Sequence, residues 1–167
     1  MKGISNRLAG GMDEAKTITY AECGSGKTEN LKVIAMTITT LFPDVKLVIM
    51  LPYPWLLQRV AEQFKKHNIT IREESNVYHG ATKDTKQMEF AETFTFKAGI
   101  TLTTPEFLAA ITLLTGSARI EDLVLLIDEI DMISPAKSYA YKGAEHFMQA
   151  RCVYGCTASE LTTDEQK

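Results

Sequence analysis

A glycine-rich loop carries the residues of this chain best suited to chemistry. Residues 21–28 read AECGSGKT, between a β-prone run, KTITY, and a segment with helical spacing. Glycines let backbone N–H groups turn toward an anion, and a helix N-terminus adds partial positive charge. Lys27 in such a loop can reach the β- and γ-phosphates of a nucleotide, and the Thr28 hydroxyl can ligate Mg²⁺. The alternative is a glycine-rich turn with a chance Lys-Thr pair, because short motifs give false positives.

A second stretch supplies paired carboxylates. Residues 123–131 read LVLLIDEID, a hydrophobic run that ends in acids. Asp128 is suited to hold Mg²⁺ through a bridging water. Glu129 is suited to orient or deprotonate an attacking water. Acids after a strand can also be a solvated helix start, where they favour the helix dipole. The two motifs together argue against both alternatives and predict phosphoryl-transfer chemistry.

The segments around these motifs alternate between strand and helix patterns. Strand patterns cover residues 16–20, 46–51, 99–103, 123–127 and 152–155, with short edge structure at 69–71 and 77–78. Helix patterns cover residues 28–42, the segments that begin at Pro54 and Pro105, and more weakly 84–94 and 141–150. This alternation predicts an α/β fold, a three-layer parallel sheet with helices on both faces. Ligands of such sheets bind at the carboxyl ends of the strands, where both motifs lie.

Composition excludes several classes of protein. The chain has 167 residues, 45% of them hydrophobic, which suits one domain with a real core, read here as 1–167. The net charge of −3 argues against binding nucleic acid by bulk positive charge, although a local basic groove remains compatible with it. The apolar runs are too short to span a bilayer, so no membrane partner is expected, and the N-terminus does not resemble a secretory signal.

The three cysteines lack zinc-site spacing and are read as reduced thiols of a cytosol-like compartment. Cys152 and Cys156 are also too far apart for the usual dithiol motif. Cys23 lies in the loop, where a helix N-terminus would favour its thiolate. We expect alkylation of Cys23 to block nucleotide entry and bound ATP to protect it. The alternative is a small buried side chain that fills space.

Ala21 stands where the common phosphate-loop pattern has glycine, and this makes a family resemblance specific. AECGSGKT is similar to A-x-x-G-x-G-K-T, the nucleotide-binding motif of superfamily 2 helicases and translocases. DEID at 128–131 resembles their D-E-x-D/H motif, and TAS at 157–159 resembles S/T-A-T, with Ser159 replacing the usual Thr. Weaker similarities follow in the family's order, namely LPYPWLL at 51–57, His79-Gly80 and TTPEFL at 103–108.

The resemblance covers nearly the whole chain and implies an N-terminal RecA-like, P-loop NTPase domain that binds ATP and Mg²⁺. It implies catalytic roles for Lys27, Asp128 and Glu129, and metal ligation by Thr28 and Asp128. The nucleotide contacts it implies are Ala21, Cys23, Gly24, Ser25, Gly26, Lys27 and Thr28. Coupling between nucleotide state and strand binding is implied for Asp131, Thr157 and Ser159. Adenine specificity is implied by the family alone, because no glutamine precedes Gln58.

The family also implies a partner, single-stranded DNA or RNA, gripped by loops after other strands. The implied contacts are Pro52, Tyr53, Gly80, Thr104, Pro105 and Glu106. A structural reading of these residues is equally open, since the prolines can begin helices and Gly80 can make a turn. DEID does not distinguish DNA from RNA.

Helicases of this family have a second RecA-like domain whose arginines reach the γ-phosphate. This chain extends eight residues beyond Ser159 and holds no Q-x-x-G-R-x-x-R pattern. We therefore expect a second domain, in cis or in trans, to complete the enzyme. The chain alone is expected to bind ATP-Mg²⁺ weakly, to hydrolyse little of it and to unwind nothing.

Three alternatives remain open. An oligomeric remodelling ATPase would share Lys27, Thr28, Asp128 and Glu129, but it normally has glycine at position 21. The protein-translocating motor of bacterial secretion also carries D-E-x-D, so a polypeptide substrate stays compatible with the motifs. A degenerate nucleotide-binding scaffold is the third, although no catalytic position is lost here.

Overall fold

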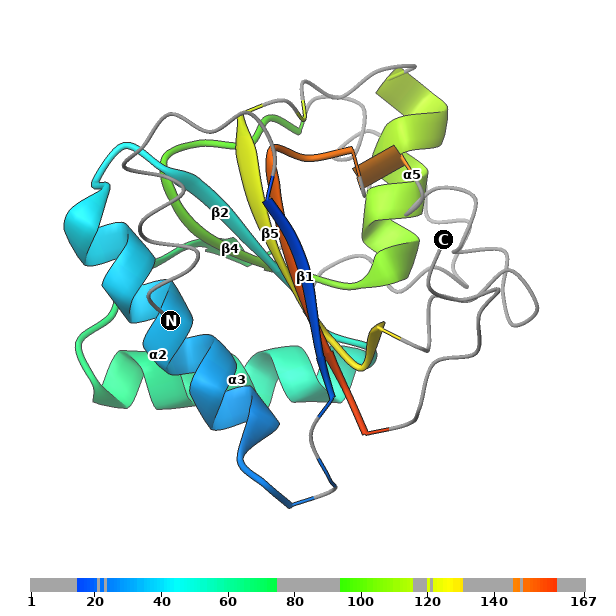
Figure 1. Ribbon diagram of the computed structural model, residues 1–167. Helices are drawn as coiled ribbons and strands as arrows, with labels where there is room; N and C mark the ends of the chain where they lie inside the picture. Colours follow the sequence, from blue (N-terminus) through cyan, green and yellow to red (C-terminus); the bar gives the residue numbers. More distant parts are fainter. Residues whose placement is uncertain are drawn as a thin grey trace.

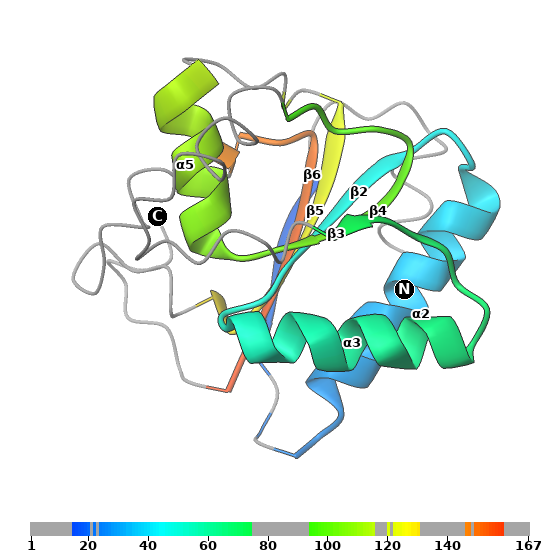
Figure 2. The ribbon, with the colours of Figure 1, turned by 180° about the vertical axis from the view of Figure 1, so that it is seen from behind.

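In the computed structural model, the described strands form one sheet. All of them run parallel, and their order in the sheet differs from their order in the sequence. The structure describes residues 15–20, 22, 24–74, 94–115, 120, 122–130, 146–147 and 149–158. Six strands from these residues lie in the order β1-β6-β5-β2-β4-β3, and each neighbouring pair runs parallel (Figure 1 and Figure 2). The bounds are β1 Ala15–Tyr20, β2 Lys46–Met50, β3 Ile71–Glu74, β4 Gly99–Thr103, β5 Leu123–Asp128 and β6 Cys152–Thr157.

Helices cover both faces of this sheet, which confirms the three-layer α/β prediction. The helices are α2 Lys27–Leu41, α3 Pro54–Lys66 and α5 Pro105–Thr115. Figure 2 shows α2 and α3 on one side of the strands and α5 on the other. Parallel strands buried on both faces need continuous apolar runs, and β5, LVLLID, is buried at every position.

The two faces hold separate hydrophobic clusters, and neighbouring strand residues alternate between them. Val48 and Met50 of β2 pack on the α5 side with Phe107, whereas Leu47 and Ile49 pack on the other side. The second cluster also contains the buried stripes of the two helices, Leu31, Ile34, Ala35 and Ile38 from α2, and Leu57, Val60 and Phe64 from α3. The helical spacing of these residues is what predicted α2 and α3 from the sequence.

Most strands and helices match the sequence prediction, with differences at their ends. The strand predicted to end at Gly155 continues to Thr157, and edge strand β3 begins at Ile71 rather than Ile69. Phe94, the predicted last residue of a helix, is not helical, and the predicted segments at 84–93 and 77–78 lie outside the described residues. In the predicted helix at 141–150, His146 and Phe147 are helical, whereas Gln149 and Ala150 are not. Within the described ranges, no helix is long and apolar enough to cross a membrane.

Candidate active site

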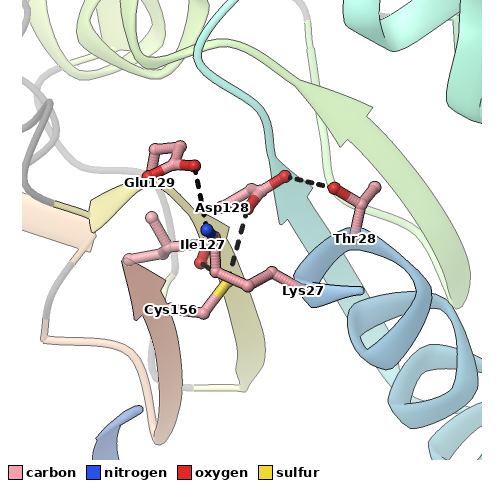
Figure 3. A network of polar contacts seen from close by, with 6 residues as sticks. All are labelled: Lys27, Thr28, Ile127, Asp128, Glu129 and Cys156. Carbon is pink, nitrogen blue, oxygen red and sulfur yellow. Dashed lines mark hydrogen bonds and ion pairs between the residues drawn. The ribbon is translucent and has the colours of Figure 1, made fainter. Parts of the chain in front are cut away.

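The sheet brings the glycine loop and the acids to the same edge. The loop follows β1 and the acids end β5, and β6 separates these two strands. Helix α2 starts at the loop and brings Thr28 close to the carboxyl end of β5. The Thr28 Oγ1 donates a hydrogen bond to Asp128 Oδ2 at 3.0 Å, although the residues lie far apart in sequence (Figure 3). The two predicted Mg²⁺ ligands are therefore in direct contact.

The loop conformation depends on its glycines. Gly24 and Gly26 have φ values of 79° and 83°, in the left-handed region that L residues with a side chain seldom adopt. Gly26 is the N-cap of α2, and no described side chain caps this helix end. The first N–H groups of a helix lack intrahelical acceptors, and a bound anion is a partner that such a helix start favours.

Lys27 and Glu129 form the second contact of the site. The Lys27 Nζ lies 3.5 Å from Glu129 Oε1, and the Lys27 side chain is only 8% exposed (Figure 3). Glu129 has a φ of 54°, which is uncommon for a residue with a side chain. Such conformations cost free energy and concentrate at functional sites. The acid predicted to act on water and the lysine predicted to hold phosphate are thus adjacent.

Cys156 is a residue of this site that sequence reasoning did not find. It pairs with Asp128 in the register of β5 and β6, so the two side chains lie on the same face of the sheet. The Cys156 Sγ donates to Asp128 Oδ1 at 3.3 Å and to the Ile127 carbonyl at 3.5 Å (Figure 3). Asp128 thus accepts from Thr28 on one oxygen and from Cys156 on the other. The register of β5 and β6 brings Cys156 beside Asp128, and this register is known only from the structure.

The proton that Cys156 donates is held firmly. Burial, followed by the negative charge of Asp128, raises the pKa of the Cys156 thiol from 9.0 to about 12. We therefore expect the folded chain to resist alkylation at Cys156 at about pH 8.5, where an ordinary thiol is substantially ionised. The thiolate fraction there is roughly a thousandfold lower than that of an unperturbed thiol. Peptide mapping by mass spectrometry after iodoacetamide treatment measures this directly.

The unfolded chain in urea is the control for that experiment and should react at Cys156 at an ordinary rate. Because the folded pKa is raised, the contribution of this thiol to stability is full below pH 9.0 and is lost as pH rises toward about 12. Equal alkylation rates in the folded and unfolded chains would contradict a buried Cys156 thiol that donates to Asp128.

Gly155 leaves room for Ile130, which follows β5, to pack against β6. A Cβ built on Gly155 would lie 2.5 Å from Ile130 Cδ1 and 3.2 Å from Ile130 Cβ. Gly155→Ala is therefore expected to lower the free energy of unfolding by about 1–3 kcal/mol, the usual cost of overpacking. Urea denaturation measures the loss. Adding Ile130→Val, which removes Cδ1, should restore part of it, and failure of this rescue would place the strain elsewhere.

The structure places the other predicted site residues in different settings. Ala21, Cys23, Gly80, Asp131 and Ser159 lie outside the described residues, so the predicted coupling contacts remain predictions. Thr157, the described member of that coupling set, is 1% exposed at the end of β6, opposite Tyr20 of β1. Ser25 is exposed in the loop.

The predicted nucleic-acid contacts divide into buried and exposed residues. Thr104 is 1% exposed, and its Oγ1 accepts a hydrogen bond from the Phe107 N–H at 3.4 Å, which caps α5. Pro105 is buried in the first turn of that helix, and Glu106 is half-buried. Pro52 is half-buried and Tyr53 is exposed. Helix capping by Thr104 and the place of Pro105 in the first turn of α5 therefore account for their side chains. The exposed Tyr53 side chain is accessible to a ligand.

Comparison with known proteins places this geometry in a family. A profile of the DEAD/DEAH box helicases matches residues 6–160, which includes both motifs. The chain belongs to the DEAD/DEAH box helicase family. This match confirms the resemblance to superfamily 2 helicases that rested on AECGSGKT, DEID and TAS. No curated protein matches the chain in a sequence comparison.

Solved helicase structures share the fold of this DEAD/DEAH box domain. The Hef helicase domain of Pyrococcus furiosus is 23% identical, with a TM-score of 0.58 over 98% of this chain and 34% of its own. The SWI2/SNF2 ATPase core of Sulfolobus solfataricus, solved in complex with dsDNA, is 17% identical, with a TM-score of 0.58 over 95% and 31%. A hypothetical ATP-dependent RNA helicase from Sulfolobus tokodaii is 19% identical, with a TM-score of 0.58 over 92% and 44%. The chain thus spans less than half the length of these relatives.

Proposed function

We propose that this chain is the ATP-binding domain of a helicase or translocase that acts on DNA or RNA. The observation that carries the proposal is the contact between Thr28 and Asp128 at 3.0 Å, with the Lys27–Glu129 ion pair beside it. A glycine loop and an acidic strand end are frequent in isolation. Here the side chains of the loop contact those of the strand end. A glycine-rich turn with a chance Lys-Thr pair, or a solvated helix start, would not need these contacts.

The residues present fit ATP with Mg²⁺. A hydroxyl and a carboxylate oxygen are the hard ligands that Mg²⁺ prefers, and Thr28 and Asp128 supply one of each. The uncapped start of α2 and Lys27 supply donors and positive charge for the phosphates. The metal, when bound, neutralises charge on the β- and γ-phosphates.

The ion pair gives the lysine and the glutamate linked roles in this proposal. A γ-phosphate bound at the loop competes with the Glu129 carboxylate for the Lys27 ammonium. Lys27 then holds phosphate, and Glu129 is released to orient or deprotonate the attacking water. Thr28 and Cys156 meanwhile hold the Asp128 carboxylate from its two sides.

A second RecA-like domain, in the same polypeptide or in a partner, completes the proposed enzyme. The greater length of the solved relatives supports this, because the chain covers 34% of the first of them and 31% of the dsDNA complex. That domain supplies the arginines for the transition state, which are worth roughly 10³–10⁵ in rate. The single-stranded nucleic acid bound, DNA or RNA, lies along the carboxyl ends of the strands.

Calorimetry of the whole chain tests the proposal. ATP should bind weakly with Mg²⁺ and more weakly with EDTA, because Thr28 and Asp128 act on the nucleotide through the metal. Absence of nucleotide binding under both conditions would overturn the proposal. Phosphate release should be slow, and turnover that matches a complete helicase would contradict the need for a second domain.

A further inference from the structure

Two exposed aromatic side chains stack on each other at the start of α3. The ring centroids of Tyr53 and Trp55 are 5.9 Å apart and their planes are inclined by 9°, so the rings lie nearly parallel. Tyr53 is 43% exposed and Trp55 is 61% exposed, the highest exposure among the large hydrophobic side chains described. A single exposed aromatic residue is ordinary. A parallel pair with this much exposed area offers a planar ligand a surface to stack on.

This pair lies at the functional edge of the sheet. It follows β2, whose carboxyl end is at the same edge as the glycine loop after β1 and the acids after β5. Tyr53 is the N-cap of α3 and Pro54 is in its first turn. The Tyr53 carbonyl accepts a hydrogen bond from the Leu56 N–H at 3.0 Å. The backbone that carries both rings is therefore held by a helix start, and the rings are positioned before any ligand arrives.

The charge of the chain favours stacking as the source of affinity here. A net charge of −3 leaves little general attraction for phosphates. Base stacking on aromatic rings does not depend on that charge, and it tolerates any sequence because every base has a planar face. Arg59 lies one helical turn beyond Trp55 and is exposed, so the helix carries a cation on the same side as Trp55.

We propose that Tyr53 and Trp55 form a stacking platform for a base of single-stranded nucleic acid. The inference rests on the proposed function and adds a contact to bases, whereas Pro52, Thr104 and Pro105 carry no aromatic ring. Trp55 lies within the LPYPWLL stretch but is not among the nucleic-acid contacts that the family resemblance implied. The ligand class is a single strand with unpaired bases, since bases within a duplex have no free face.

The sole tryptophan of the chain makes the platform directly observable. Trp55 fluorescence is recorded during titration of the whole chain with an oligothymidylate of about 12 nucleotides, within the usual site size. The matched ligand is an abasic oligomer of the same length and charge. We expect the oligothymidylate to quench Trp55 and to bind roughly 5- to 150-fold more tightly than the abasic oligomer, the range measured for one stacked base.

Variants separate stacking from folding. Trp55→Ala should lose the preference for the oligothymidylate while keeping the weak affinity for the abasic oligomer, both measured by anisotropy of a labelled oligomer. Trp55→Phe retains a ring and should keep most of the preference. Leu41→Ala is the control, because Leu41 is 56% exposed at the far end of α2.

The outcomes distinguish this inference from the proposed function. Equal affinity for the two oligomers with unchanged fluorescence overturns the platform and leaves nucleic-acid binding by phosphates intact. Binding of neither oligomer overturns both the platform and the nucleic-acid part of the proposed function. Unchanged preference of Trp55→Ala for the oligothymidylate over the abasic oligomer would also overturn the platform, because the ring would then contribute nothing to base binding.

Discussion

Lys27→Ala is expected to weaken ATP-Mg²⁺ binding by about 10- to 150-fold, the usual worth of a hydrogen bond to a charged group. The lysine is the first residue of α2, its side chain is buried, and it lies 3.5 Å from Glu129. Removing it takes away the charge that the phosphates would meet and leaves Glu129 to repel them. Calorimetry of the variant beside the unaltered chain measures the loss.

Lys32→Ala is the matched control, because Lys32 lies in the same helix and is similarly buried, 7% exposed against 9% for Lys27. The Lys32 ammonium contacts Glu29 and donates to Gln63 Oε1 at 2.8 Å, which ties α2 to α3 away from the loop. This variant should lose stability and retain nucleotide binding. Equal affinity of Lys27→Ala and the unaltered chain would show that the phosphates bind elsewhere.

Phe107→Ala is expected to lower the free energy of unfolding by about 3–5 kcal/mol, the usual cost of truncating a buried phenylalanine. Phe107 is fully buried on α5 and makes an edge-to-face contact with Phe94, with centroids 5.1 Å apart. Phe96 and Phe147 extend the same aromatic cluster. For a chain of this size the melting temperature should fall by roughly 6–20 °C.

Urea denaturation followed by circular dichroism checks this result through the midpoint at constant slope. Phe107→Leu keeps most of the buried volume and should cost much less. A loss below about 1 kcal/mol for Phe107→Ala would mean that α5 does not anchor this face of the sheet.

The sequence predicted the parts of the fold that local pattern determines. The run LVLLID is short and has no polar residue before Asp128, which favours a strand covered on both faces, and β5 is such a strand. The glycine loop was predictable because Gly24 and Gly26 occupy backbone conformations that exclude most residues. The order of motifs along the chain then gave the family.

Side-chain contacts between strands could not be predicted from local sequence pattern. The hydrogen bond from Cys156 to Asp128 depends on which residues of β5 and β6 face each other, and the chain's local pattern carries no register. The motif resemblance implied a nucleic-acid contact at Thr104, which stays a prediction, and only the structure shows that its hydroxyl caps α5. No role was assigned to Trp55 from the sequence, and its exposure and its stacking on Tyr53 are visible only in the structure.

The place of β1 in the sheet also bears on how this chain folds during synthesis. Among the described strands β1 pairs with β6 alone, and Ala15 of the first strand lies opposite Cys152 of the last. Pairing such distant segments requires closure of a long loop, which is entropically costly and slow. On the ribosome β2, β4 and β5 can associate while the strand before the glycine loop still lacks its partner. Under the proposed function, the nucleotide site is complete only after β6 has emerged and paired with β1, so ATP binding would aid folding late rather than early.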